Sequence, residues 1–290
     1  MQWTPDWGLR ARMALTMFLL FALYLVFVGA LWAYFTDLFA VVAVMGVFLV
    51  AQYFFSDRVA LYSMGARRVE ESEYPRLYGT VRRLSQQADL PTPDVAVADT
   101  RVPNAFATGR NREHATVAVT TGLLSTLDED ELAGVLGHEL AHVKNRDVAV
   151  MTVASFLSSL AFLVVRWGWW FGGGRNRNQA PVYVAILVSL VVWVVSFLLV
   201  RALSRYREFA ADRGGALITG QPGALATALL RISGEMDRVP SEDLREQAEM
   251  NAFFVIPIDR GFLGRIAATH PPTEARVERL RELERELERA

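Results

Sequence analysis

Long uncharged segments alternate with charged ones along the chain. Four stretches contain no Asp, Glu, Lys, Arg or His, and each is close to the roughly 20 residues that an α-helix needs to cross a bilayer. A single stretch could be a buried core helix, but four in one chain favour transmembrane helices. The first is also too long for the apolar region of a signal peptide. The predicted spans are Met13–Tyr34, Leu38–Phe55, Val148–Val165 and Val182–Val200.

These spans form two predicted membrane hairpins, which divide the chain into four parts. The two polar parts together are large enough for one domain with its own core. We therefore expect one soluble domain that the second hairpin splits in the sequence. The expected parts are residues 1–55 for the first hairpin, 56–147 for the first polar part, 148–200 for the second hairpin and 201–290 for the second polar part.

Periodicity within the polar parts predicts both helices and strands. Apolar residues recur at helical spacing in three segments, and two short Val-rich runs are typical of strands. Asp128, with Glu131 three residues later, is a capping-box pattern that marks the start of the second helix. The split domain is therefore expected to be of the α+β class. Its helices are expected at 74–88, 128–143 and 272–290, its strands at 95–98 and 116–120, and a loop or irregular edge at 101–112.

Basic residues beside the spans indicate the orientation. Most lie next to the polar parts, whereas the loop between the third and fourth spans contains Arg166, Arg175 and Arg177. The excess of basic residues predicts that the polar parts and both termini are cytoplasmic in a multi-pass cell-membrane protein. The predicted spans carry no ionisable residue, which argues against a transporter or an ion channel.

Composition narrows the possible functions further. Of the 290 residues, 52% are hydrophobic, and the formal net charge of -1 lacks the basic excess of a nucleic-acid-binding protein. The chain has no cysteine, which excludes disulfide scaffolds, thiolate metal sites and thiol nucleophiles. A metal site would have to use histidines and carboxylates, and there are only 4 histidines.

The sequence His-Glu-Leu-Ala-His at 138–142 carries the clearest chemical signal. Residues four apart lie on the same face of a helix, so His138 and His142 can bind one metal ion. Glu139 then lies near the ion without being a ligand, as a general base for water activation requires. The spacing predicts a catalytic zinc site, which needs a third protein ligand.

Five segments of the sequence, in order, carry a resemblance to a known family: Thr120–Leu124, the 138–142 motif, Lys144–Asp147, Ser204–Asp212 and His270–Arg276. On these segments the chain resembles the HtpX family of membrane-bound zinc metalloproteases, which is related to the CAAX prenyl proteases. The resemblance implies a zincin-like metalloprotease fold, one zinc ion, protein or peptide substrates and a role in membrane-protein quality control and stress response. Four predicted spans are fewer than in the prenyl proteases, which favours HtpX.

Glu208 is the third zinc ligand that the resemblance implies. Its distance from the membrane supports this role: at about 1.5 Å per helical residue, His142 lies about 9 Å before the third span and Glu208 about 12 Å after the fourth. Asp147 competes with Glu208 but is close to His142 in sequence, and Glu235 has no such placement. Alternatively, Glu208 is a surface carboxylate paired with a neighbouring arginine.

Two further residues are candidates for supporting roles. Asp212 lies one helical turn beyond Glu208, and we expect it to accept a hydrogen bond from one zinc-binding histidine unless it is an ordinary surface residue. His270 resembles the family's late histidine, which implies that it stabilises the oxyanion as a catalytic residue. It could equally be a histidine that caps a turn.

Asn104 and Ala105, followed by a phenylalanine, resemble the edge segment that precedes the zinc helix in glutamate-zincin proteases. An extended peptide that pairs with such an edge is bound mainly through its backbone, which suits broad specificity. The alternative is a loop anchored by a buried phenylalanine.

Together these features predict a membrane-bound zinc endopeptidase that acts on membrane proteins and contacts the lipid bilayer but no nucleic acid. Water activated by the metal would lose a proton to Glu139 and attack the peptide carbonyl. One alternative is a protease for prenylated proteins. The other is a membrane scaffold whose zinc is not catalytic.

Overall fold

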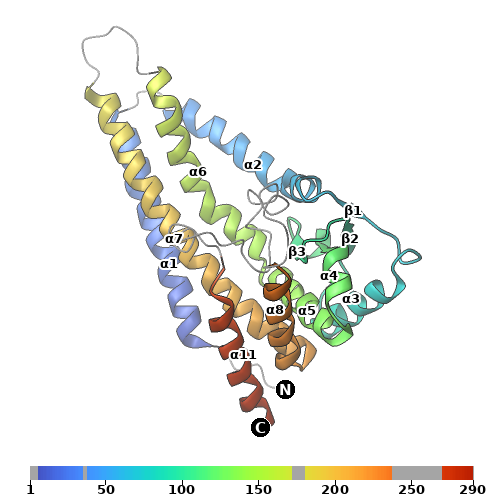
Figure 1. The fold of residues 1–290 in the computed structure, drawn as a ribbon. Helices are drawn as coiled ribbons and strands as arrows, with labels where there is room; N and C mark the ends of the chain where they lie inside the picture. Colours follow the sequence, from blue (N-terminus) through green and yellow to red (C-terminus); the bar gives the residue numbers. More distant parts are fainter. Residues whose placement is uncertain (1–5, 35–37, 172–179, 237–269, 290) are drawn as a thin grey trace. The chain divides into compact units, whose positions relative to one another are not determined.

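The computed structural model of the chain describes residues 6–34, 38–171, 180–236 and 270–289, and helices predominate in it (Figure 1). The helices are α1 (Trp7–Tyr34), α2 (Leu38–Ser63), α3 (Pro75–Gln87), α4 (Thr121–Thr126), α5 (Glu129–Asn145), α6 (Asp147–Phe171), α7 (Ala180–Thr219), α8 (Pro222–Met236) and α11 (Thr273–Glu288). The strands are β1 (Ala66–Arg68), β2 (Asp94–Ala98), β3 (Ala105–Thr108) and β4 (Thr116–Thr120), with a 3-10 turn at Arg112–His114.

The chain forms two compact units, each made from more than one segment. The first unit contains Phe55–Ala149 and Arg205–Ala290, and the second contains Pro5–Phe54 and Val150–Ser204. Helices α2, α6 and α7 contribute residues to both units. Each unit has its own hydrophobic clusters.

Apolar helices make up the second unit. Phe27 of α1, Leu160 of α6 and Val192 of α7 meet in one of its clusters, and the three helices run alongside one another in Figure 1. Each has a segment long and apolar enough to cross a membrane. These segments are Trp7–Gly29, Asp147–Arg166 and Tyr183–Thr219.

Three of the four predicted spans therefore coincide with such helices. The remaining one, Leu38–Phe55, lies in α2, a helix of 26 residues, and its crossing of a membrane stays a prediction. Arg175 and Arg177, two of the basic residues between the third and fourth predicted spans, lie outside the described residues.

Helix α7 is much longer than the span predicted within it. It has 40 residues and continues from the apolar stretch that ends at Val200 through residues 201–219, where charged side chains occur again. Hydropathy marks where the apolar part of the helix stops, but Arg, Leu, Glu and Ala all have good helix propensity, so the helix continues. Glu208 and Asp212 therefore lie one turn apart on this helix, in the first unit.

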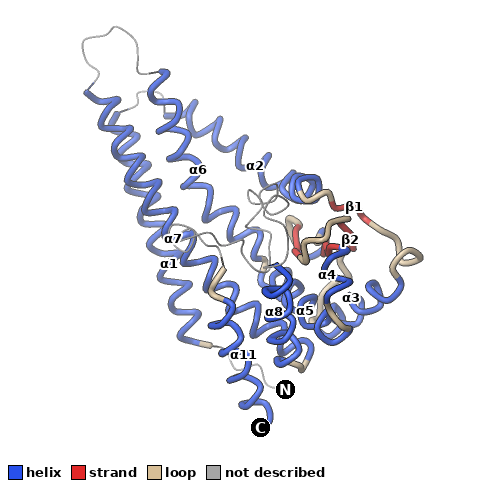
Figure 2. Tube along the Cα trace, viewed as in Figure 1, coloured by secondary structure: helices blue, strands red, loops and turns tan. Residues whose placement is uncertain are grey.

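A small mixed sheet forms part of the first unit, with its strands gathered beside α3, α4 and α5 (Figure 2). The strand order is β1-β2-β4-β3, with β2 and β4 parallel and the outer strands antiparallel to their neighbours. The segment expected as a loop or irregular edge contains the regular strand β3. The three-residue strand β1 was not predicted, because it is too short for an alternating pattern.

Helix α5 lies at the centre of the first unit. It contacts β3, α3 and α8, and α8 in turn packs along α11 (Figure 1). Val135, Leu136 and Leu140 are completely buried in the core that these elements share. The helix is therefore held from several sides, which fixes the positions of its functional side chains.

The capping box predicted at the start of α5 is present. The Asp128 carboxylate accepts a hydrogen bond from Glu131 N at 3.0 Å, and the Glu131 carboxylate accepts one from Asp128 N at 3.1 Å. The carboxylates thus satisfy two backbone N–H groups that the helix would otherwise leave unpaired.

Asp128→Ala should destabilise the first unit by about 1 kcal/mol because it removes the N-cap acceptor. We expect the melting temperature, followed by circular dichroism in detergent, to fall by roughly 2–4 °C. Asp130→Ala, an exposed position in the first turn of the same helix, is the matched control and should have a smaller effect. Equal melting temperatures for the two variants would contradict the capping argument.

Candidate metal centre

Helix α5 places its three motif residues in the interior of the first unit. His138 and Glu139 are buried, with 1% and 4% of their surfaces exposed, and His142 is partly exposed. The two imidazole rings lie one turn apart, with their centroids 4.6 Å from each other. The helical spacing expected from the sequence is therefore realised in a largely buried site.

Two glycines allow α7 to cross α5 at backbone contact. A Cβ atom on Gly215 of α7 would lie 2.6 Å from the backbone nitrogen of His138, and one on Gly137 would lie 2.9 Å from Thr219. Cβ atoms essentially never lie this close to other heavy atoms, so a side chain at either position would force the two helices apart. The crossing brings Glu208 of α7 to the histidines of α5.

The ligand-type atoms of His138, His142 and Glu208 converge on one point. They all lie within 4.8 Å of one another. The two Nε2 atoms are 3.1 Å apart, and the Glu208 oxygens lie 3.6 Å from His138 Nε2 and 3.4 Å from His142 Nε2. Atoms around a tetrahedral zinc ion with bonds of about 2.0–2.1 Å are about 3.3 Å apart, so the spacing fits such an ion.

Carboxylates hold the opposite nitrogens of both rings. His138 Nδ1 lies 2.9 Å from Asp212 Oδ1, and His142 Nδ1 lies 2.5 Å from Asp147 Oδ2. An Nδ1–H that donates to a carboxylate leaves the lone pair on Nε2. Two Nε2 lone pairs then face each other beside the Glu208 carboxylate, an arrangement that a cation stabilises.

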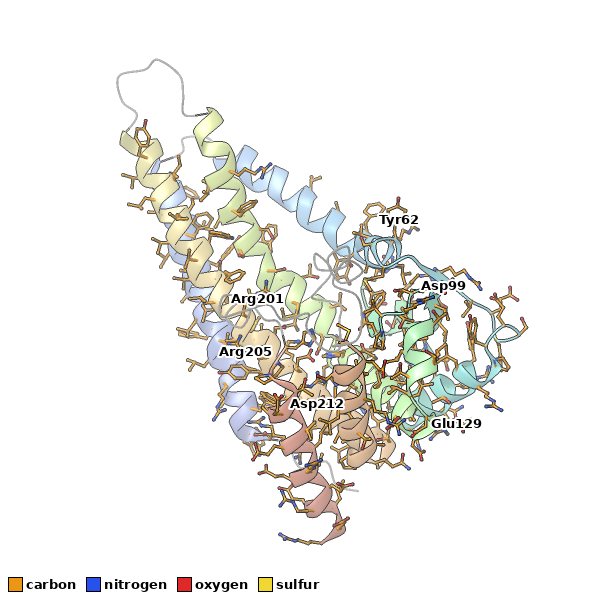
Figure 3. All side chains as sticks on the ribbon, viewed as in Figure 1. Tyr62, Asp99, Glu129, Arg201, Arg205 and Asp212 are labelled. Atoms are coloured by element: carbon orange, nitrogen blue, oxygen red, sulfur yellow. The ribbon has the colours of Figure 1, made fainter. Side chains whose placement is uncertain are left out.

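Arg276 joins α11 to this arrangement. Its guanidinium is 1% exposed and donates two hydrogen bonds to the Asp212 carboxylate, at 2.9 and 2.6 Å. Figure 3 shows Asp212 on α7 close to α11. Burial alone would lower the pKa of Arg276, but the negative charges of Asp212, Glu208 and Glu139 outweigh it and raise the pKa, so the side chain stays charged.

The pKa of His142 reflects the same concentration of negative charge. Burial alone would lower it, but hydrogen bonding to Glu208 and the charges of Glu208 and Glu139 raise the pKa above its ordinary value. The negative charges that raise this pKa also favour a divalent cation beside the ring. The electrostatics therefore agree with the geometry.

His270, a candidate catalytic residue from the sequence, lies beside this centre, whereas His114 and Glu235, which the sequence does not single out as site residues, lie apart from it. His270 Nδ1 lies 2.7 Å from Glu208 Oε2, and His270 is 8% exposed. His114 is exposed on the 3-10 turn, and Glu235 lies on α8 outside the group of ligand-type residues. The structure thus brings the late histidine to the centre and leaves these two residues apart.

The predicted substrate edge is strand β3, but the backbone groups of Asn104, just before this strand, are already hydrogen-bonded to Thr120. Thr120 N donates to the Asn104 carbonyl at 2.9 Å, and Asn104 N donates to Thr120 Oγ1 at 2.9 Å. Its side chain is completely buried. Because backbone groups alternate in direction along an antiparallel strand, those of Ala105 and Ala107 point away from β4, toward the side of β3 on which the described residues place no further strand.

The contact between Asp147 and His142 was not predicted from the sequence. Asp147 was considered only as a rival metal ligand, whereas the structure places its carboxylate against the far side of the His142 ring. A carboxylate beyond the end of a helix that bears two histidines is the signal that could have identified it.

The chain is similar to known proteins in both sequence and fold. Residues 71–284 match peptidase family M48. The chain is 54% identical to protease HtpX homolog 2 of Methanosarcina mazei, covering 99% of each chain, and 53% identical to the protease HtpX homolog of Moorella thermoacetica, covering 98% of this chain and 97% of the relative. Among solved structures it is similar to Ste24p of S. mikatae, with a TM-score of 0.53 and 17% identity. That match covers 89% of this chain and 62% of Ste24p, and it supports the fold alone.

Proposed function

Because the chain belongs to peptidase family M48, we propose that it is a zinc-dependent endopeptidase anchored in the membrane. The observation that carries the proposal is the convergence of His138 Nε2, His142 Nε2 and a Glu208 oxygen within 4.8 Å, with Glu139 on the same helix turn. When bound there, zinc would supply Lewis-acid polarisation of the peptide carbonyl and a lowered pKa for water.

The number of ligands favours a catalytic over a structural centre. Within the described ranges the group has three members, and a structural zinc site is normally closed by four protein ligands. Asp212 is not free to become the fourth, because it bonds to His138 Nδ1 and to Arg276. The arrangement therefore supports an enzyme rather than a scaffold with inert zinc.

Glu139 is the proposed general base and acid. Its buried carboxylate would take a proton from the attacking water and then pass it to the nitrogen of the leaving amine. His270, beside Glu208, is the proposed donor to the developing oxyanion. Asp212 is proposed to accept a hydrogen bond from His138 Nδ1 and so to fix the orientation of that ring.

Strand β3 is the proposed docking edge for the substrate. The sheet, in its described part, ends at this strand, which contacts the zinc helix α5. An extended peptide could pair with the backbone groups of Ala105 and Ala107. Recognition of backbone rather than side chains would give broad specificity.

Membrane proteins are the proposed substrates, in a quality-control role. Apolar helices and the names of the two HtpX-type relatives support this role, and the excess of basic residues beside the polar parts supports a cytoplasmic active site. The relatives span almost the same length as this chain, so the likeness extends over both units.

Removal of the metal should abolish cleavage. Protein purified in detergent and treated with chelator should not cut casein or itself, and one equivalent of zinc should restore the activity. His142→Ala should not regain activity, because it lacks a ligand. His114→Ala, which changes an exposed histidine outside the centre, should recover like the wild type.

Other outcomes of these assays would indicate a different function. Undiminished cleavage by protein shown to be free of metal would exclude a metalloprotease. Zinc binding by a folded protein that cuts neither casein nor prenylated peptides would favour the scaffold. Cleavage of prenylated peptides alone would indicate a prenyl-protein protease.

A further inference from the structure

Asp147, the first residue of α6, lies behind the ring of His142. Its Oδ2 is 2.5 Å from His142 Nδ1, and the side chain is 9% exposed. On the opposite side of the same ring, Nε2 lies 3.4 Å from Glu208 Oε1. Asp147 therefore contacts the side of the ring that faces away from the converging ligand atoms.

A sharp turn brings Asp147 to this place. Between α5 and α6, Arg146 adopts the left-handed conformation, with φ 58 and ψ 41, which costs a residue other than glycine roughly 1–2 kcal/mol. Two contacts hold the end of α5: Arg112 donates to the Lys144 carbonyl at 3.1 Å, and Lys144 Nζ donates to the Ala88 carbonyl at 2.9 Å. The surrounding structure thus fixes a turn that the local sequence does not favour.

Arg207 of α7 holds the other oxygen of the carboxylate. It forms an ion pair with Asp147 Oδ1, and only 5% of its side chain is exposed. A buried carboxylate needs such a partner to remain ionised. With one oxygen on Arg207 and the other on His142, the Asp147 carboxylate has little freedom to rotate.

The same arrangement occurs on the other ring. His138 Nδ1 lies against Asp212, and Arg276 holds that carboxylate with two hydrogen bonds. The two carboxylates come from different helices, α6 and α7, and the two arginines from α7 and α11. Each histidine therefore has its own carboxylate and its own buried arginine.

We propose that Asp147 is the positioning residue of His142, with Arg207 holding its carboxylate. This inference rests on the metal centre proposed above. The Asp147 carboxylate accepts a hydrogen bond from His142 Nδ1–H, so the Nε2 lone pair points to the metal position and the ring cannot turn away from it. The metal would be bound less tightly without this contact, even though no ligand is removed.

Asp147→Asn tests the proposal because it keeps the size of the side chain and removes its charge. The amide also places an N–H group opposite either Arg207 or His142, where only an acceptor fits. We expect zinc affinity, measured by competition with a chromogenic chelator, to fall about 10–100-fold. Asp94→Asn, which changes an exposed carboxylate in the same unit, is the control and should bind zinc like the wild type.

A second measurement uses the wild type and does not depend on the folding of a variant. The chain has 4 histidines, so long-range proton–nitrogen spectra of histidine-labelled, zinc-free protein can be assigned. We expect His142 Nδ1 to carry a proton, which it donates to Asp147. Unchanged zinc affinity in Asp147→Asn, or a His142 Nδ1 that carries no proton, would overturn the positioning role. Failure of the wild type to bind zinc would instead overturn the metal centre itself.

Discussion

Glu139→Gln should lower the rate of casein cleavage by about 10²–10⁴-fold, the usual contribution of a general acid–base group. The amide is nearly the same size as the carboxylate but cannot accept a proton from water. Glu139 is not a member of the ligand group, so the variant should still bind one zinc ion with wild-type affinity. Cleavage assays and metal analysis of the same preparation would measure both properties.

The matched control is Glu129→Gln, the same substitution in the first turn of the same helix. Glu129 is 85% exposed and pairs with Arg76 at 3.4 Å, an interaction that contributes little to stability at the surface. Its activity should equal that of the wild type. Near wild-type turnover by Glu139→Gln would falsify the proposed base, and loss of zinc would show that Glu139 helps to bind the metal.

Gly215→Ala should reduce both cleavage and zinc affinity, although it alters none of the side chains that would bind zinc or take part in catalysis. The new Cβ atom would lie 2.6 Å from the backbone nitrogen of His138 and 2.8 Å from its Cα, so α7 must move away from α5. Glu208 and Asp212 move with α7. Because a misplacement of about 1 Å can cost 10²-fold in rate, we expect cleavage to fall by about that factor and zinc affinity to fall with it.

Gly234→Ala is the control for this substitution. Gly234 lies in helix α8, and a Cβ atom added to it would have no described neighbour from outside its own stretch of helix within 4 Å. Alanine there should therefore leave activity unchanged and stabilise the helix slightly. Zinc titration and casein cleavage of both variants, with helicity checked by circular dichroism, would provide the comparison. Wild-type zinc affinity in Gly215→Ala would show that the helices can separate without disturbing the ligands.

Local patterns in the sequence were sufficient to predict the zinc helix. The spacing of His138 and His142 depends only on helical periodicity, and the capping box locates the start of α5. The strands at 95–98 and 116–120 were likewise predicted from short Val-rich runs, and the structure has them as β2 and β4. These features depend on neighbours within a few residues.

Features that depend on three-dimensional contacts were not predictable in the same way. The turn at Arg146 requires a left-handed residue where the sequence has no glycine, so nothing local showed that Asp147 would fold back on His142. The need for glycine at positions 137 and 215 arises from the crossing of α5 and α7, which no local sequence pattern shows. Glu208 was singled out through a family resemblance and its distance from a predicted span, because no local pattern distinguishes it from other carboxylates.

The discontinuous first unit also has a consequence for producing it as a separate fragment. Truncation from either end cannot isolate it, because its two main segments, Phe55–Ala149 and Arg205–Ala290, are separated by an insertion, residues 150–204, that belongs to the second unit. The ion pair between Asp147 and Arg207 lies two residues inside each point where the chain leaves the unit. The ends of the insertion therefore start close together, and a short flexible linker in place of residues 150–204 is the replacement that their spacing favours.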